Sequence, residues 1–219
     1  MLCLFDIDGT LLLKASAAHA QAVLEAMGAV YGLTERPDGP LQAAGRTDVE
    51  IARQLALLGG VSAERFDAGR DDFRVAASEA YARLCPDDLS AHVAPGVTDV
   101  LDALASRDDV HLAVLTGNLE PIARLKLARA GLGRFFEHGQ GGFGSDHEDR
   151  TELPAIARGR AGGYPRAQTV IIGDTPRDIA CARADELRCI AVATGPYSAA
   201  ELDGADVVLE SAHDLLEVL

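Results

Sequence analysis

The chain has no apolar run long enough to cross a membrane. Its 219 residues contain no stretch that approaches the roughly 20 apolar residues of a membrane-spanning helix. The apolar N-terminal run is broken by Asp6 and Asp8, and no basic region precedes it. These absences argue against secretion and membrane insertion, and we expect a soluble globular protein.

Cysteines are few, and none stands at the spacing of a metal site or a redox pair. The four cysteines show no CxxC motif and no other ligand-like spacing: Cys3, Cys85, Cys181 and Cys189. Cys3 lies in an apolar segment, where a small buried thiol is common. A reduced protein of the cytoplasm is the simplest interpretation.

Positive charge is also in short supply. Lysine and arginine together number 20 against 34 aspartates and glutamates, which gives a formal net charge of -14 at pH 7. This balance disfavours nucleic acid as a partner, because a phosphate backbone attracts basic surfaces. The only lysines are Lys14 and Lys126, and no glycine-rich loop ends in Gly-Lys-Ser or Gly-Lys-Thr. A kinase that binds a nucleoside triphosphate through such a loop is therefore disfavoured.

What the sequence does contain is a concentrated chemical signal near its N-terminus. Residues 2–13 read LCLFDIDGTLLL, and the apolar run 2–5 predicts a buried parallel strand. Open α/β sheets bind ligands at the carboxyl ends of such strands, where Asp6 and Asp8 stand. Two carboxylates in apolar surroundings need a cation or hydrogen-bond donors nearby, and Mg²⁺, which prefers hard oxygen ligands, is the obvious candidate. Asp6 can then act as a nucleophile and Asp8 as a proton shuttle, although a strand that ends in an Asp-Gly turn is the plainer alternative.

A second apolar run ends in groups suited to bind phosphate. Residues 111–115 read HLAVL and lead directly into Thr116, Gly117 and Asn118. The Thr116 hydroxyl and the backbone N–H groups that follow it can donate to a phosphate oxygen. We therefore expect residues 116–118 to contact the phosphoryl group of a substrate.

A third apolar run ends in carboxylates. Residues 169–172 read TVII and continue into Gly173 and Asp174, and Asp178 follows one helical turn later. Asp174 offers a further ligand for a metal and Asp178 a carboxylate behind it, so we count both with the metal site. Three strand ends with these residue types are what phosphoryl transfer requires.

The three strand ends resemble the motifs of the haloacid dehalogenase superfamily. Its phosphatase members carry DxDxT first, a second motif ending in serine or threonine, and a fourth motif of the GDxxxD type. Here these segments read DIDGT, VLTGN and GDTPRD. The resemblance implies that Asp6 is the nucleophile that forms an aspartyl phosphate and that Asp8 is the general acid and base. It also implies that Asp6, the backbone carbonyl of Asp8 and Asp174 hold Mg²⁺, with Thr116 on the transferring phosphoryl group.

One element departs from the pattern of that superfamily, whose third motif supplies a lysine. Neither lysine lies where it should, and the positional candidate is Arg150 in SDHEDRTELPAIA. It stands immediately before an expected helix that Thr151 would cap and whose first turn tolerates Pro154. We expect Arg150 to be catalytic and to bind phosphate, with a geometry that differs from that of lysine. In the alternative it lies in a solvated loop and pairs with an acidic neighbour: Asp146, Glu148 or Asp149.

The order of the expected elements predicts an α/β fold, a doubly wound parallel sheet of the Rossmann-like type with an inserted helical domain. Apolar strands alternate with helices after residue 93, whereas the region between the first strand and residue 92 is helical in pattern. We therefore expect a core domain of residues 1–14 and 93–219 and a helical cap of residues 15–92. A cap can exclude water and select the substrate.

Within the expected cap, residues 45–48 read GRTD and resemble a segment of phosphoglycolate phosphatase-like members of that superfamily. Arg46 is therefore a candidate for contact with substrate. In the plainer alternative Thr47 caps the helix that follows and Arg46 is solvated. His19 and His147 are weaker candidates, because no carboxylate or cysteine at ligand spacing accompanies either one.

Together these features predict a Mg²⁺-dependent phosphatase that hydrolyses a small phosphorylated metabolite through phospho-Asp6. Dehalogenases lack the second aspartate, so Asp8 argues against them, and phosphonatase-like relatives need a cap lysine that residues 15–92 do not contain. A sugar phosphomutase has the same motifs and stays the enzymatic alternative, and a noncatalytic binding or regulatory protein is the alternative of another class. Phosphoglycolate, sugar phosphates and nucleoside monophosphates all fit as ligands, and the oligomeric state is open.

Overall fold

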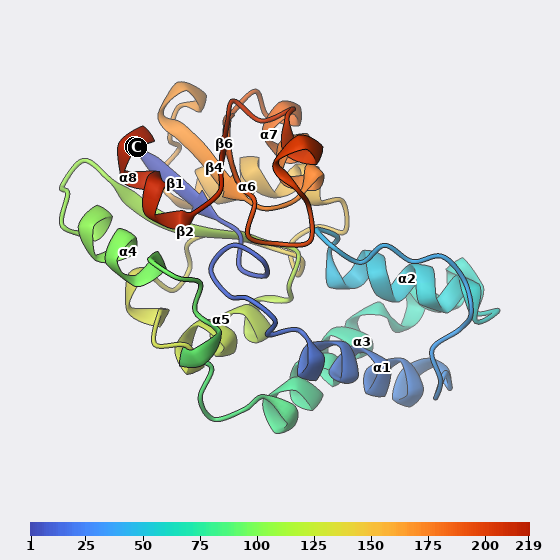
Figure 1. The fold of residues 1–219 in the computed structure, drawn as a ribbon. Coiled ribbons are helices and arrows are strands. Elements are labelled where there is room, and N and C mark those ends of the chain that lie inside the picture. The colour runs from blue at the N-terminus through green and yellow to red at the C-terminus, as the bar shows by residue number, and fades with distance from the viewer.

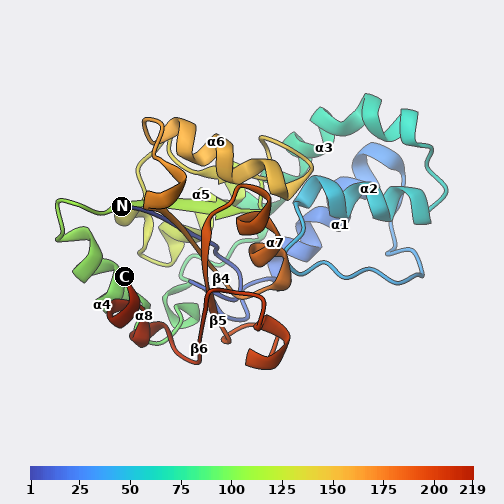
Figure 2. The same cartoon turned by 90° about the horizontal axis from the view of Figure 1, so that it is seen from above.

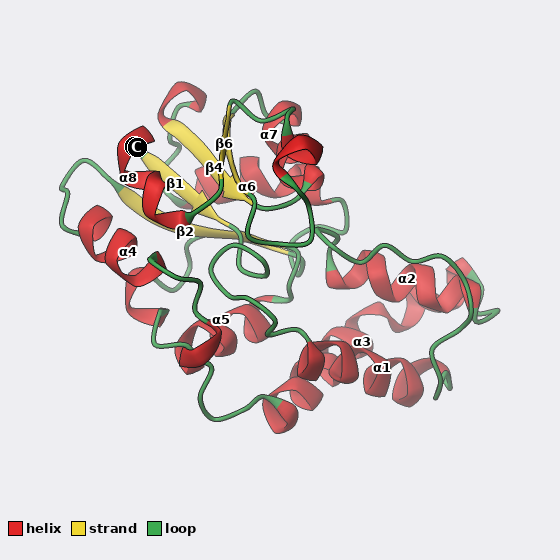
Figure 3. Cartoon of the chain, in the orientation of Figure 1, coloured by secondary structure: helices red, strands yellow, loops and turns green.

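The strands of this protein form one parallel sheet. The computed structural model describes residues 1–219, and its six strands lie in the order β3-β2-β1-β4-β5-β6. Their bounds are β1 Leu2–Phe5, β2 His111–Thr116, β3 Gly142–Phe143, β4 Thr169–Gly173, β5 Arg188–Val192 and β6 Val207–Leu209. Figure 3 shows the sheet in yellow, with β1, β2, β4 and β6 labelled. The order reverses direction at β1, so the predicted doubly wound α/β fold is confirmed, and its switch point lies at the first strand.

The central strands begin and end at the same level. Leu2 of β1 is paired with His111 of β2 and with Thr169 of β4, and this register continues to Phe5. All four residues of β1 are buried, as expected for a parallel strand that has helices on both faces. The residues that follow β1, β2 and β4 therefore meet at one edge of the sheet.

Alternate residues of β1 belong to two different hydrophobic clusters. The core helices are α4 Val97–Ala105, α5 Glu120–Arg129, α6 Leu153–Arg160, α7 Pro176–Ala184 and α8 Leu215–Val218. Cys3 and Phe5 pack with α4, α5 and α8, whereas Leu2 and Leu4 pack with α6 and α7. Figure 2 shows α4 and α6 on opposite sides of the strands. This division follows from the two-residue period of side chains along a strand.

The chain between β1 and α4 is helical, as predicted. Its helices are α1 Ala17–Tyr31, α2 Asp48–Leu58 and α3 Ala63–Leu84. Together they form the helical segment, residues 17–84, which lies beside the sheet in Figure 1. The side chain of Thr47 accepts the N–H of Glu50 at the start of α2, and Ser62 caps α3 in the same way. The predicted cap at Thr47 is therefore confirmed.

The two connections between the helical segment and the sheet lie side by side. The N–H of Leu13 donates to the His92 carbonyl at 2.7 Å, and the N–H of Ala94 donates to the Leu11 carbonyl at 2.9 Å. The chain thus leaves and re-enters the sheet layer at one place. The expected division into a core and an inserted cap domain at residues 15 and 93 stays a prediction.

All four cysteines are buried, and none is in a disulfide. They lie in β1, at the end of α3, in α7 and in β5. No helix combines the length and the apolar character that a membrane span requires.

Candidate active site

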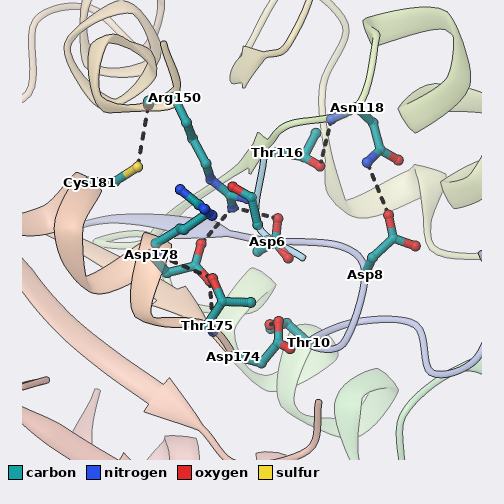
Figure 4. A network of polar contacts seen from close by, with 12 residues as sticks. Asp6, Asp8, Thr10, Thr116, Asn118, Arg150, Asp174, Thr175, Asp178 and Cys181 are labelled. Carbon is teal, nitrogen blue, oxygen red and sulfur yellow. Dashed lines mark hydrogen bonds and ion pairs between the residues drawn. The ribbon is translucent and has the colours of Figure 1, made fainter. Parts of the chain in front are cut away.

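Asp6 lies directly after β1, at the carboxyl edge of the sheet. Its N–H donates to the Ile172 carbonyl of β4 at 2.9 Å, which extends the pairing of the two strands by one residue. Asp6 is 4% exposed, and its Oδ1 accepts a hydrogen bond from Arg150 Nη2 at 2.8 Å (Figure 4). The expected nucleophile is therefore held in place by the sheet and by a buried cation.

Asp6, Asp174 and Asp178 form a buried acidic cluster. One carboxylate oxygen from each residue lies within 4.8 Å of those of the other two. Burial raises the pKa of Asp6 to about 7 and the pKa of Asp174 to about 8, and repulsion from neighbouring carboxylates adds to both shifts. Carboxylates this close together require positive charge.

The surroundings of Asp174 fit a divalent cation in this cluster. Its Oδ1 accepts from Thr10 Oγ1 at 3.1 Å, but its Oδ2 is buried without any partner. A Cβ at Gly9 would lie 2.1 Å from that oxygen and one at Gly195 would lie 1.7 Å from it, so only glycine fits at either position. A set of oxygen donors with an unsatisfied buried oxygen suits a hard cation such as Mg²⁺.

Arg150 is the cation that the structure places in this cluster. It is 5% exposed and stands at the start of a short 3₁₀ turn, Arg150–Glu152. Its Nη2 donates to Asp6 Oδ1 at 2.8 Å and to Asp178 Oδ1 at 2.5 Å, while Nη1 donates to the Gly45 carbonyl at 2.8 Å. One guanidinium thus joins the nucleophile, the acidic cluster and the chain just before α2.

The alternative in which Arg150 lies in a solvated loop and pairs with an acidic neighbour is wrong. The three acidic neighbours are engaged elsewhere: Asp146 pairs with Arg160, Glu148 pairs with Arg53, and Asp149 accepts from Thr151. The side chain of Arg150 points inward because its guanidinium group pairs with two buried carboxylates, those of Asp6 and Asp178. Its catalytic role stays a prediction.

The expected start of the helix after Arg150 needs a correction. Thr151 is not the cap; Asp149 Oδ1 accepts the Thr151 N–H at 2.9 Å and its hydroxyl at 2.7 Å, and α6 begins only at Leu153. An aspartate two residues before a free N–H forms a local turn more readily than a threonine at the helix start. Pro154 lies in the first turn of α6, as predicted.

Asp178 has a structural partner on its own helix as well. Its Oδ2 accepts the N–H of Thr175 at 3.0 Å and the Thr175 hydroxyl at 2.7 Å, and Thr175 in turn caps α7. Its other oxygen accepts from Arg150. This reciprocal capping fixes the carboxylate behind Asp6 and Asp174.

Asp8 points away from the acidic cluster toward Asn118 (Figure 4). Its two oxygens accept from Lys126 Nζ at 2.8 and 2.6 Å, and Oδ2 also accepts from Asn118 Nδ2 at 3.0 Å. Burial alone would raise the pKa of Asp8, but the charges of Lys126 and His19 and these hydrogen bonds hold it below its usual range. The expected proton carrier therefore rests as an ion pair.

Lys126 belongs to a buried polar network that the sequence did not indicate. Its ammonium group is within 3.1 Å of His19 Nδ1, and His19 Nε2 is 3.0 Å from Asp48 Oδ2. The same Asp48 oxygen accepts the N–H of Leu119 at 2.8 Å, and the ring of Tyr81 packs edge-on against His19. All three helices of the helical segment thereby reach the residues beside Asp8.

The sequence contains one sign of this network, at Lys126, and hides another part of it, at His19. Lys126 lies on the face of α5 that Ile122 and Leu127 bury, which is an unusual position for a lysine. The carboxylate partner of His19 is Asp48, 29 residues away in sequence, so a search for partners at ligand spacing could not find it. His147 contacts only the backbone of Asp149 in an exposed loop, which fits its weaker standing.

Thr116 and the two residues after it lie at the end of β2 beside Asp6. Thr116 is buried, and its Oγ1 accepts the Asn118 N–H at 3.3 Å. Gly117 has to be glycine, because a Cβ there would lie 2.0 Å from the Arg46 carbonyl oxygen. The predicted contact of these residues with phosphate is untested and stays a prediction.

Arg46 is neither free nor fully solvated. It pairs with Glu50 of α2, and its Nε donates to the Gln42 carbonyl at 2.8 Å. The residue also lines the cavity described next, so contact with substrate stays a prediction for it.

The strand ends and the helical segment line a partly open cavity of about 770 Å³, which we call the active-site chamber. Asp6, Asp8, Thr116, Arg150 and Asp174 line one side of it. Residues of α1, α2 and the loop between them line the other. A ligand bound to the strand ends would therefore also touch the helical segment.

A family model described as haloacid dehalogenase-like hydrolase matches residues 3–183. Phosphoglycolate phosphatase 1 of Pseudomonas aeruginosa is 27% identical over 223 residues, which cover 98% of this chain and 78% of that protein. The first comparison confirms the resemblance that the strand-end motifs indicated.

Solved structures of the same architecture align over nearly the whole chain. A protein of Clostridium acetobutylicum described as a "predicted phosphatase" has a TM-score of 0.70 and 18% identity, over 100% of this chain and 98% of its own. A candidate β-phosphoglucomutase of Bacteroides vulgatus has a TM-score of 0.68 and 21% identity, over 99% of this chain and 86% of its own. At these identities the likeness shows the fold alone.

Proposed function

The chain belongs to the haloacid dehalogenase-like hydrolase family, and from this premise we propose that it is a Mg²⁺-dependent phosphatase of small phosphomonoesters. The observation that carries the proposal is the set of groups at the end of β1. Asp6 stands in an acidic cluster suited to a divalent cation, and a second carboxylate, Asp8, follows two residues later. Nucleophile, metal site and proton carrier are the components of covalent phosphoryl transfer.

In this proposal Asp6, Asp174 and the backbone carbonyl of Asp8 hold the cation. Asp178 lies behind them and keeps Arg150 in place through its 2.5 Å ion pair. The bound cation would neutralise negative charge on the phosphoryl oxygens. Arg150 and Thr116 supply further donors toward those oxygens, so that negative charge is matched as it develops.

The first step transfers the phosphoryl group to Asp6. A carboxylate oxygen of Asp6 attacks phosphorus while the bond from phosphorus to the ester oxygen breaks. Asp8 gives its proton to that leaving oxygen, and an alcohol departs. For this step Asp8 has to be protonated and to turn from Lys126 toward the substrate.

The second step returns Asp6 to its initial state. The Asp8 carboxylate takes a proton from a water molecule, whose oxygen attacks the phosphorus of phospho-Asp6. The bond between phosphorus and the Asp6 oxygen breaks, which releases inorganic phosphate and leaves Asp8 protonated for the next cycle.

Substrate selection lies with the helical segment, which we assign to a cap domain of residues 15–92 on a core of residues 1–14 and 93–219. Its contribution to the chamber supports this division. The substrate is a small phosphorylated metabolite of the cytoplasm, and Arg46, Gly117 and Asn118 are assigned to contact it. The named relative makes phosphoglycolate the first ester to test.

Phosphate release from a panel of phosphomonoesters and a generic aryl phosphate tests the proposal. We expect release with Mg²⁺, none with EDTA, and a loss of at least about three orders of magnitude in Asp6→Asn, which lacks the nucleophile. Asp203→Asn, at an exposed site, is the matched control. Circular dichroism checks that both variants fold.

Three outcomes would contradict the phosphatase assignment. Wild-type rates in Asp6→Asn would exclude this nucleophile, and full rates in EDTA would exclude the cation. If a folded wild-type chain releases no phosphate, sugar monophosphates are tested for isomerisation with a trace of the bisphosphate. An isomer as product would identify a phosphomutase, and no reaction at all would favour a noncatalytic role.

A further inference from the structure

The active-site chamber has an apolar wall that the proposed chemistry does not use. Five apolar side chains of α1, α2 and the loop between them line it: Val23, Leu24, Leu41, Ile51 and Leu55. Leu24 is partly buried but packs against neither hydrophobic cluster, so the core does not account for its position. The chamber therefore offers contact to an apolar group as well as to phosphate.

Two exposed cations in the lining of the chamber are unpaired. Lys14 and Arg36 both line it, and the side chain of neither forms an ion pair or a hydrogen bond. The other two cations in its lining are engaged, Arg46 with Glu50 and Arg150 with Asp6 and Asp178.

A cationic side chain without an ion pair or a hydrogen bond is unusual in this chain. Elsewhere, lysine and arginine side chains pair with carboxylates, and the three that do not, Arg65, Arg177 and Arg188, each donate to a backbone carbonyl. Aspartate and glutamate outnumber lysine and arginine by 34 to 20, so partners are abundant. Both of the cations left without a partner line the same cavity.

The backbone of Lys14 supplies an independent observation. Its φ is 56°, and it is one of only two non-glycine residues with a positive φ. Hydrogen bonds at Leu13 and burial of Ala15 fix the chain on either side of it. A lysine in this conformation raises the free energy of the fold, and strain of this kind gathers at functional sites.

Resting on the proposed phosphatase function, we propose that the leaving group of the substrate has an apolar body and ends in a second anionic group that Lys14 and Arg36 bind. The ester is then longer than phosphoglycolate, whose two carbons offer little to the apolar wall. A chamber of about 770 Å³ accommodates such a molecule.

Three esters separate the parts of this inference. Phosphoglycolate has the second anion without the apolar body, hexyl phosphate has the apolar body without the anion, and 6-phosphonooxyhexanoate has both. We expect kcat/KM to be highest for the last, by about tenfold over hexyl phosphate, because two cations each contribute the modest energy of an exposed ion pair.

The variants Lys14→Asn and Arg36→Gln test whether these two residues cause the preference for the carboxylated ester. Asparagine tolerates the left-handed backbone conformation, so the lysine charge is removed without added strain. We expect the ratio of kcat/KM for the carboxylated ester to that for hexyl phosphate to fall toward one in the double variant. Arg188→Gln, which removes an exposed arginine at the start of β5, should leave this ratio as in the wild type.

The second-anion subsite and the phosphatase function can fail independently, and the measurements distinguish the two cases. Aryl phosphate hydrolysis with no preference for the long carboxylated ester, or a preference that survives the double variant, would overturn the inference and leave the phosphatase intact. If no ester is hydrolysed, the phosphatase assignment fails. The three esters are then compared by titration calorimetry: tighter binding of the carboxylated ester that the double variant loses supports the subsite, and equal binding overturns it.

Discussion

Arg150 shows how a single residue can connect parts of a site that are far apart in sequence. Its guanidinium group reaches Asp6, Asp178 and the Gly45 carbonyl at the same time. Arginine does this because its nitrogens form a planar fork, whereas lysine offers donors from one nitrogen only. Lysine could keep the positive charge beside Asp6 but would give up part of this geometry.

Substitution of Arg150 should separate charge from geometry. Arg150→Ala leaves two buried carboxylates unpaired, and we expect it to lower the free energy of unfolding by about 3 kcal/mol or more and turnover by about 100-fold or more. Arg150→Lys should keep turnover within about tenfold of the wild type. Urea unfolding and phosphate release measure the two effects.

A surface arginine provides the control for these variants. Arg134→Ala removes an exposed pair with Asp102 and should change stability by less than about 1 kcal/mol. Wild-type turnover in Arg150→Ala would show that the arginine is not part of the machinery, and wild-type turnover in Arg150→Lys would support its assignment to the third motif.

The carboxylates of Asp6 and Asp174 give the metal-free protein a characteristic pH dependence. Burial raises the pKa of Asp6 to about 7 and of Asp174 to about 8, whereas unfolded aspartates ionise near about pH 4. The folded chain then binds these protons more tightly. Their contribution to stability is complete below about pH 4 and is lost as the pH rises through 7 to 8.

Mg²⁺ should therefore stabilise the protein more at high pH than at low pH, because it replaces the protons that the cluster loses. We expect its effect on Tm, measured against EDTA, to be small at about pH 5 and larger by several degrees at about pH 8.5. A magnesium shift of the same size at both values would show that the cluster does not bind the cation. Asp174→Asn should reduce the difference.

At the scale of elements, a polar network ties the helical segment to the core. His19 comes from α1, Asp48 from the start of α2 and Lys126 from α5, and the last of these holds Asp8. Helices that met only through apolar contacts could slide against one another more freely. Here the network fixes one arrangement, in which α1 and α2 stand over the end of β1.

Loss of Asp48 should therefore loosen this connection. Asp48→Ala leaves the Leu119 N–H and His19 without an acceptor, and we expect a decrease of about 1 to 3 kcal/mol in the free energy of unfolding. Asp48→Asn keeps one acceptor oxygen and should lose less. In a double-mutant cycle with His19→Ala, a coupling energy of about 0.5 kcal/mol or more is expected, and strict additivity would contradict the network.

At the scale of the whole molecule, the sequence predicts the fold better than it predicts the contacts of the site. The central strands and the residues after them follow from short apolar runs, which are local signals. β1 ends where expected, and β2 and β4 each end one residue later than their apolar runs. The helical segment follows from composition over a longer range. The two-residue period of β1 then assigns its side chains to the two faces.

The contacts that the sequence did not predict join residues far apart in the chain. Arg150 and Asp178 are 28 residues apart, and Lys126 and Asp8 are 118 residues apart. No local pattern encodes such pairs, because they depend on how helices pack on the sheet. The predicted start of α6 is wrong for a different reason. Asp149 accepts the N–H of Thr151 in a local turn, and the helix begins only at Leu153.

The buried cysteines can serve as built-in probes of local unfolding. Burial raises the pKa of Cys3 and of Cys181 to about 12, so almost no thiolate is present at these two positions of the folded chain, and thiol reagents act on thiolate. Cys85 ends α3, whereas the other three cysteines lie in β1, α7 and β5. Mass spectrometry measures the rate at which each cysteine is alkylated in mild urea. This rate reports how fast the helix or strand that holds the cysteine unfolds. Earlier labelling of Cys85 would mean that the helices over the chamber come apart while the sheet stays closed.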